Sequence, residues 1–151
     1  MERNEIPRYV PDASVAVKWY VEEKGSRPAR RLRELFQQGK VDLDAPSLLK
    51  YEVASALRFH AVARFTLRQL RGVMESLEGL QITREPSDRE WATAFTLSLD
   101  NQISIYDAAY VAFAVHGRSR MVTADTVLVT RLKSAETRQR PILLADLDIG
   151  R

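Results

Sequence analysis

ISIYDAAYVAFAV, residues 103–115, is the stretch of the chain around which the rest must be arranged. Read as a helix it is apolar on every face, which is typical of a helix buried in the middle of a domain. Its one charged side chain is Asp107. Because a buried ionised carboxylate is costly unless it is paired, hydrogen-bonded or bound to a metal ion, we expect Asp107 to face a partner elsewhere in the fold.

A purely structural role for Asp107 is also possible from the sequence. Ser104 and Asp107 have the spacing of a capping box, in which the Asp107 carboxylate would return to the Ser104 amide and do nothing more. The functional interpretation requires that other carboxylates converge on the same end of the fold.

Short apolar runs alternate with helical periodicities along the chain. The predicted strands are residues 8–11, 41–45, 80–83, 121–123 and 141–144. The predicted helices are residues 15–21, 28–38, 48–63, 66–77, 87–99, 103–115 and 127–132, before a polar tail. This alternation predicts an α/β domain with a mostly parallel sheet and helices on both faces. Pro11 should end the first strand, because proline cannot donate to a sheet.

Length and composition predict one ordinary globular domain over 1–151, with its core at about 8–146. The chain has 151 residues, of which 45% are hydrophobic and 28% charged. Residues 1–8 lack the apolar segment of a signal peptide, and no run of about 18 apolar residues is present. We therefore expect a cytoplasmic protein without a membrane anchor.

The residue types narrow the chemistry. There is no cysteine, and the two histidines, His60 and His116, are isolated in sequence. These facts exclude disulfides, thiolate nucleophiles and zinc sites built from cysteine or several histidines. Any metal must be held by oxygen, which points to Mg²⁺ or Mn²⁺. The net charge of +3 is compatible with a nucleic-acid substrate but does not establish one.

Four carboxylates are predicted to share one edge of the fold. Asp12 follows the first predicted strand and Asp125 follows the fourth, whereas Glu52 and Asp107 lie in early turns of helices that start from the same edge. Glu52 falls in the middle of an apolar helix stripe, where a surface glutamate would not be placed. In parallel sheets, sites form at the carboxyl ends of the strands.

Each of these acids also has a structural interpretation. Asp12 and Asp125 could be helix N-caps, and Glu52 could be one half of a buried ion pair. Ser14 and Thr123 could bond the local backbone, or they could position Asp12 and Asp125. If the four acids do meet, their repulsion requires protons or cations, which suits one or two Mg²⁺ or Mn²⁺ ions and metal-assisted phosphodiester hydrolysis.

Four blocks of the sequence resemble the signature blocks of PIN-domain ribonucleases, and most of all those of VapC-type toxins from VapBC toxin–antitoxin pairs. They are residues 10–14 (VPDAS), 46–57 (PSLLKYEVASAL), 104–110 (SIYDAAY) and 122–125 (VTAD). The resemblance covers nearly the whole chain in the family's order. Pro11 departs from the pattern, since a β-branched residue is commoner there.

The resemblance implies a fold, an activity and partners. It implies a five-stranded parallel sheet of order 3-2-1-4-5, cleavage of RNA by an endonuclease that depends on Mg²⁺ or Mn²⁺, and a homodimer. It also implies inhibition by a VapB-like antitoxin, whose C-terminal segment would wrap the toxin and cover its acidic site.

The resemblance also assigns roles to residues. Asp12, Glu52, Asp107 and Asp125 match the family's four catalytic metal ligands, and Ser14 and Thr123 match its accompanying hydroxyls. Asp12, Glu52 and Asp107 would hold the first metal, with Asp125 acting directly or through water. Cleavage would leave a 5′-phosphate and a 3′-hydroxyl.

Basic residues near the start of the chain are candidates for guiding the RNA backbone. These candidates are Lys18, Arg27, Arg30, Arg31 and Arg33. The alternative for each of them is a solvated helix face.

Two other functions are compatible with an acidic rim. One is a catalytically inactive PIN-like module that binds RNA or a protein. The other is a phospho-receiver, which is disfavoured because Asp12 is followed by Ala13 and Ser14 rather than by a second acid, and because no lysine adjoins the fifth predicted strand.

Overall fold

Parallel strands form the centre of the fold in this computed structural model, which describes residues 5–149. Four strands form one sheet in the order β2-β1-β5-β6: β1 (Arg8–Pro11), β2 (Asp42–Leu43), β5 (Arg120–Thr123) and β6 (Pro141–Leu143). Two further strands, β3 (Ala45–Pro46) and β4 (Thr83–Arg84), form a second sheet. All of these strand pairs are parallel.

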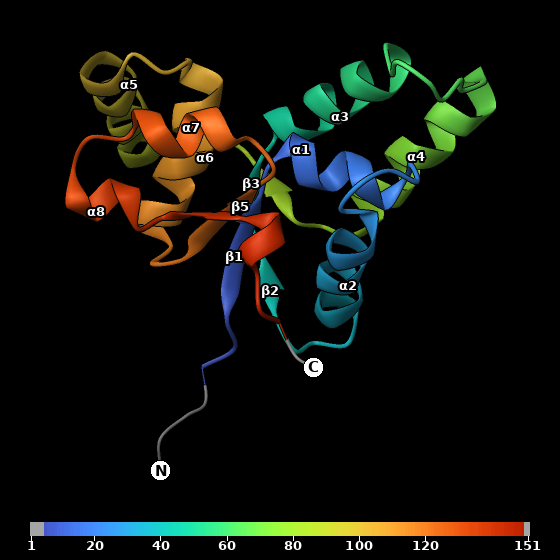
Figure 1. Ribbon diagram of the computed structural model, residues 1–151, viewed down its shortest axis with the longest axis horizontal. Helices are drawn as coiled ribbons and strands as arrows, with labels where there is room; N and C mark the ends of the chain where they lie inside the picture. Colours follow the sequence, from blue (N-terminus) through green and yellow to red (C-terminus); the bar gives the residue numbers. More distant parts are fainter. Residues whose placement is uncertain (1–4, 150–151) are drawn as a thin grey trace.

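The helices cover the strands from two sides. They are α1 (Ala13–Ala16), α2 (Ser26–Gln37), α3 (Leu48–Arg58), α4 (Leu67–Gly79), α5 (Asp88–Asn101), α6 (Ile105–His116), α7 (Thr126–Arg131) and α8 (Ala135–Arg138), with short 3₁₀ helices η1 (Val17–Trp19) and η2 (Leu144–Asp146). Figure 1 shows α1–α4 on one side of the strands and α5–α8 on the other. The predicted α/β class, with its mostly parallel sheet, is confirmed.

The predicted continuous sheet of five strands is wrong, although its segments do follow the expected order 3-2-1-4-5. The predicted strand 41–45 is divided at Asp44. The Asp44 amide donates to the Tyr9 carbonyl at 3.1 Å, whereas the next amide, that of Ala45, donates to the Ile82 carbonyl at 2.9 Å. The chain therefore passes from one sheet to the other within one residue, and β3 pairs with β4 alone.

Two predicted helices have different limits in the structure. The helix predicted over 15–21 starts earlier, because Asp12 caps α1, and it tightens into a 3₁₀ turn after Ala16. The helix predicted over 48–63 ends at Arg58. There the His60 ring nitrogen Nδ1 accepts hydrogen bonds from the amides of Val62 and Ala63, at 3.2 and 2.9 Å, which stabilises a turn in place of another helical turn.

The segment after the predicted strand 141–144 is more than a polar tail, because η2 extends to Asp146 and the side chains of Leu147 and Ile149 pack against the core. The short helix α8 was not predicted. Residues 1–4 and 150–151 lie outside the described residues. The predictions that fall on them are the two limits of the domain, the absence of a signal peptide and the end of the polar tail. Within residues 5–149, no helix has both the length and the apolar character needed to cross a membrane.

Helix α6 is the centre of the core, as its all-apolar sequence predicts. All residues from Ala108 to Ala114 are buried. The helix packs against α5 and against β1, β3 and β5. Its first turn, which includes Asp107, is thereby fixed at the edge where β1 and β5 end.

An ion-pair cluster that the sequence analysis did not identify joins the second sheet to α5 and α6. Arg84 in β4 donates to both carboxylate oxygens of Glu90 at 2.7 and 2.9 Å and to Asp44 at 3.0 Å. Its guanidinium also lies over the Phe113 ring, 4.2 Å from the ring centroid. Glu90 is only 3% exposed, whereas the Arg84 side chain is 47% exposed, so the pair lies at the edge of the core with its carboxylate on the buried side.

We expect Glu90→Gln to lower the free energy of unfolding by about 1.5–3 kcal/mol at pH 7, the range for hydrogen bonds to charged groups. Burial opposes ionisation of Glu90, but hydrogen bonds from Arg84 and Ser87 outweigh it and lower its pKa from 4.5 to about 2. Because the folded pKa is the lower one, this stabilisation is complete above pH 4.5 and is lost as the pH falls towards 2. Denaturant unfolding at several pH values measures it.

The matched control is Glu75→Gln, which changes an exposed glutamate on α4. It should leave the free energy of unfolding within about 0.5 kcal/mol of the wild-type value. Equal stability of Glu90→Gln and wild type at pH 7 would contradict the prediction.

Candidate active site

Asp12 is the most buried carboxylate of the predicted rim, with 7% of its surface exposed. It follows β1 and caps α1, where its oxygen Oδ1 accepts from the Val15 amide at 3.3 Å. The hydroxyls of Ser14 and Thr123 each donate to it at 2.5 Å, one to each carboxylate oxygen. Burial raises the pKa of Asp12 from 3.8 to about 6, against these hydrogen bonds, and repulsion from Asp107 adds to the shift.

Ser14 and Thr123 connect Asp12 to the segment that contains Asp125. The Ser14 hydroxyl accepts from the Ala124 amide at 2.8 Å, and the Thr123 hydroxyl accepts from the Asp125 amide at 3.0 Å. Each hydroxyl therefore bonds both the backbone and the Asp12 carboxylate, so the two interpretations offered for these residues are combined in one arrangement.

Glu52 lies on the inner side of α3 and is half-buried. Its partner is the Tyr110 hydroxyl of α6, which donates to Oε1 at 2.7 Å. In the described part of the chain, no lysine, arginine or histidine forms an ion pair with it. Burial raises the pKa of Glu52, and repulsion from Asp107 raises it further.

Asp107 has only half of the predicted capping box. The Ser104 hydroxyl accepts from the Asp107 amide at 3.0 Å, whereas no return bond to the Ser104 amide is present among the described residues. The carboxylate is half-buried. Burial raises its pKa, and repulsion from Asp125 raises it further, whereas Ser104 and Arg131 act in the opposite direction.

Asp125 is exposed and caps α7, as the structural interpretation proposed. Its oxygen Oδ1 accepts from the amides of Val127 and Leu128 at 2.9 and 3.3 Å. The second carboxylate oxygen, Oδ2, has no hydrogen bond in the described part of the chain, so capping leaves one oxygen of Asp125 free to act.

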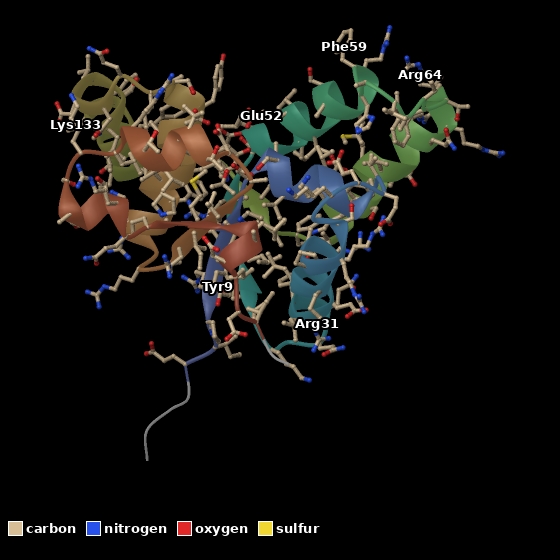
Figure 2. The ribbon with its side chains drawn as sticks, in the orientation of Figure 1. Tyr9, Arg31, Glu52, Phe59, Arg64 and Lys133 are labelled. Carbon is tan, nitrogen blue, oxygen red and sulfur yellow. The ribbon has the colours of Figure 1, made fainter. Side chains whose placement is uncertain are left out.

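The four acids influence one another electrostatically at a single rim. Asp107 repels Asp12, Glu52 and Asp125. Burial raises the pKa of Tyr110, and the carboxylates of Glu52, Asp12 and Asp107 raise it further. Figure 2 shows Glu52 at the end of α3 that faces the α5–α8 side of the fold. Four segments that are distant in sequence thus contribute negative charge to one place.

A divalent cation is the group that this donor set fits. Asp12, Glu52 and Asp107 provide only oxygen atoms, and within residues 5–149 none of them has an ion-pair partner. In their present arrangement, however, no three described carboxylates or imidazoles meet closely enough to hold one ion. Like charges separate, and Asp12, Glu52 and Asp125 are each held by their own hydrogen bonds.

The predicted RNA-binding residues do not gather at this rim. Lys18 pairs with Glu23 at 3.1 Å, Arg31 pairs with Glu34 at 3.2 Å, and Arg30 pairs with Glu22. Arg27, Arg30 and Arg31 line one cavity on α2. Figure 2 shows Arg31 far from Glu52. Arg33 lies over the Tyr20 ring, 5.8 Å from its centroid.

Two residues of the site were not predicted from the sequence. Tyr110 holds Glu52, and Arg131 supplies the positive charge that favours ionisation of Asp107. The spacing of Tyr110 offered a signal, because residues three apart on a helix share a face and Tyr110 follows Asp107 by three. Arg131 offered no comparable signal.

The comparisons with known proteins point to one family. The family model described as PIN domain matches residues 9–132. Ribonuclease VapC3 of Pyrobaculum aerophilum is 31% identical over 136 residues, which cover 86% of this chain and 98% of that protein. The crystal structure of PAE2754 from Pyrobaculum aerophilum superposes with a TM-score of 0.63 over 85% of this chain and 81% of that chain. At 18% identity, the latter shows a shared fold alone.

The chain therefore belongs to the PIN-domain family. Within that family it is of the VapC type, as the likeness to Ribonuclease VapC3 over nearly the whole of that protein shows. The resemblance seen in the four sequence blocks is confirmed.

Proposed function

We propose that this protein is an endoribonuclease that depends on Mg²⁺ or Mn²⁺ and acts as the toxin of a type II toxin–antitoxin pair. One observation supports the proposal above all others: Asp12 is buried and Glu52 and Asp107 are half-buried at one rim, yet no basic side chain of residues 5–149 pairs with them. The relative Ribonuclease VapC3 supports RNA as the substrate.

In this proposal the chain's own residues prepare a cation site. Asp12, Glu52 and Asp107 hold one or two ions, and Asp125 contributes its free oxygen directly or through water. Ser14 and Thr123 fix both oxygens of Asp12, and Tyr110 fixes Glu52, so the carboxylates face the rim in defined orientations. A bound divalent ion supplies Lewis acidity, which activates a water and offsets charge on the phosphodiester.

The remaining partners follow from the VapC type. We propose that a VapB-like antitoxin covers the acidic rim and that the protein acts as a cytoplasmic homodimer. Lys18, Arg27, Arg30 and Arg31 remain candidates for contacts with the RNA backbone at a distance from the cut, because three of them share one side of α2.

Incubation of purified, antitoxin-free protein with total cellular RNA tests the proposal. We expect discrete fragments with 5′-phosphate and 3′-hydroxyl ends in Mg²⁺ or Mn²⁺ and none in EDTA. RNA binding without cleavage in either ion would favour the inactive PIN-like binding module instead. The separation of the carboxylates in their present arrangement is the observation in favour of that alternative.

Replacing Tyr110 by phenylalanine tests whether Tyr110 positions Glu52. Tyr110→Phe removes the hydroxyl that bonds Glu52 and leaves the buried ring in place. We expect the Mn²⁺ concentration for half-maximal cleavage to rise about 10–100-fold, the usual cost of losing a partner of a metal ligand. Activity at saturating Mn²⁺ should recover in large part.

Phe113 offers the matched control, because it is an equally buried aromatic residue on the same helix and has no hydroxyl to the acids. Phe113→Leu should lower stability and leave the Mn²⁺ requirement unchanged. An unchanged Mn²⁺ requirement in Tyr110→Phe would show that Tyr110 only packs.

A further inference from the structure

A cleft with aromatic walls opens beside the acid rim, between the first turns of α3 and α6. Its volume is about 290 Å³. Three of its lining residues, Tyr51, Trp91 and Tyr106, are aromatic, and we call it the aromatic cleft. Most of its remaining lining is apolar, including Pro46, Leu48, Pro86, Ile105 and Ala109.

On each of two helices, a residue that lines the aromatic cleft directly precedes a residue of the acid rim. Tyr51 precedes Glu52 on α3, and Tyr106 precedes Asp107 on α6. Consecutive residues of a helix point about 100° apart, so these tyrosines face outward where their neighbours face the rim. The hydrogen bond from Tyr110 to Glu52 joins the two helices at this point. A molecule in the cleft therefore lies next to anything held by the acids.

The three aromatic side chains of the cleft are solvent-exposed. Tyr51 is 76% exposed, and Tyr106 and Trp91 are also exposed. Trp91 stacks on Phe95, with ring centroids 5.9 Å apart, which lengthens the aromatic wall along α5. A concave, mostly apolar cleft with aromatic side chains in its lining is the usual form of a site for an organic ligand.

The charge of the cleft indicates which part of a nucleotide fits it. Its one charged lining residue is Glu85, whose carboxylate accepts from the Ser47 hydroxyl at 2.5 Å. A phosphate would be repelled by this anion, whereas a flat, uncharged ring would be buried against aromatic faces. Unpaired RNA bases are recognised in this way, by stacking on tyrosine and tryptophan.

We propose that the aromatic cleft binds an unpaired base of the RNA, adjacent to the phosphodiester at the acid rim. This inference rests on the proposed function for the identity of the substrate. Tyr51 and Tyr106 are binding residues in it, and they select single-stranded RNA because a paired base cannot leave its stack to enter the cleft at low cost.

Binding of a single-stranded probe in EDTA, where no cleavage occurs, tests the proposal. The probe is a fluorescein-labelled oligomer of twelve uridines, followed by fluorescence anisotropy. We expect Tyr51→Ala to raise its Kd about 5–150-fold, which corresponds to about 1–3 kcal/mol for one stacked base. Tyr51→Phe should bind as wild type does, because it keeps the ring.

The chain offers a closely matched control in Phe59→Ala. Phe59 follows α3, is 75% exposed, and lies at the far end of that helix from Glu52, as Figure 2 shows. Its removal should leave the Kd unchanged. A base-free ribose-phosphate oligomer of equal length separates base from backbone: wild type should prefer the uridines, and Tyr51→Ala should bind both oligomers equally.

Three results would overturn the inference. They are a wild-type Kd for folded Tyr51→Ala, an equal loss of affinity for the base-free oligomer, and a change of oligomeric state in Tyr51→Ala with unchanged affinity for the uridines. The third would identify the cleft as a contact between copies of the chain. If metal-dependent cleavage is the same in wild type and Tyr51→Ala, the proposed function holds and the base-binding role of the cleft does not. If base binding depends on Tyr51 but no cleavage occurs, the cleft binds a base and the proposed function is wrong.

Discussion

Asp107→Asn should abolish RNA cleavage and leave the fold at least as stable as before. We expect cleavage to fall by more than about a hundredfold, because even the loss of a group that only orients a metal ligand costs about 10–100-fold. Stability should be equal or higher in metal-free buffer, because Asp107 is repelled by Asp125 and in turn repels Asp12 and Glu52. A structural carboxylate would behave in the opposite way.

The experiment combines two measurements on the same protein samples. Cleavage of total RNA in Mn²⁺ reports activity, and denaturant unfolding in EDTA reports the free energy of unfolding. Asp88→Asn is the control, since Asp88 also lies in the first turn of a helix, α5, but is exposed and is not among the charges that shift the pKa values of Asp12, Glu52 and Asp107. If Asp107→Asn cleaves RNA as fast as wild type, or if it is unfolded in EDTA, Asp107 is not a ligand of the proposed site.

Mn²⁺ should stabilise the folded protein by an amount that depends on the acid rim. A ligand that binds only the folded state at a hundred times its Kd contributes about 2.7 kcal/mol. For a chain of this length, we expect the midpoint of thermal unfolding to rise by roughly 5–10 °C. Asp12→Asn should lose most of this rise, because Asp12 is the most buried of the proposed ligands.

Glu75→Gln provides the comparison for this experiment, because it removes an exposed carboxylate on α4 and should keep the full rise. A midpoint that is insensitive to Mn²⁺ in the wild type, together with cleavage that survives EDTA, would contradict a metal-dependent site. An equal rise in Asp12→Asn would move the site away from the acid rim.

The parts of the fold that follow from local sequence were predicted well. β1 ends at Pro11 as its missing amide requires, and the helix predicted from residue 87 starts one residue later, at Asp88, behind a capping box formed by Ser87 and Glu90. The burial of α6 follows from a sequence with no polar face. These features depend on neighbours in the chain, and periodicity and capping rules describe neighbours well.

Features that depend on distant residues were missed. The division of the predicted strand at Asp44 arises because that residue bonds Tyr9, whereas the next residue bonds Ile82. α3 ends shortly before His60, whose ring is held by Glu23, 37 residues earlier, at 3.0 Å while it accepts from two backbone amides. An isolated histidine in the sequence gives no indication of that distant partner. No local pattern predicts which strand or ring a given amide will meet.

The acids of the site could be placed at one rim from topology, but their hydrogen-bond partners could not. Glu52 was expected to pair with a cation or bind a metal, and its protein partner is the Tyr110 hydroxyl. The basic residues of α2 are largely engaged with nearby glutamates, which a count of positive charges does not reveal.

The hydrogen bond between Thr123 and Asp12 spans 111 residues of sequence, and it has a consequence for biosynthesis. β1 pairs with β5, and Thr123 at the end of β5 donates to Asp12. The nascent chain therefore cannot fix the orientation of Asp12 until Thr123 has left the ribosome. At about 5–20 residues per second, the ribosome needs about 6–22 seconds to cover that interval. Interrupted translation products that end before β5 therefore lack an assembled acid rim.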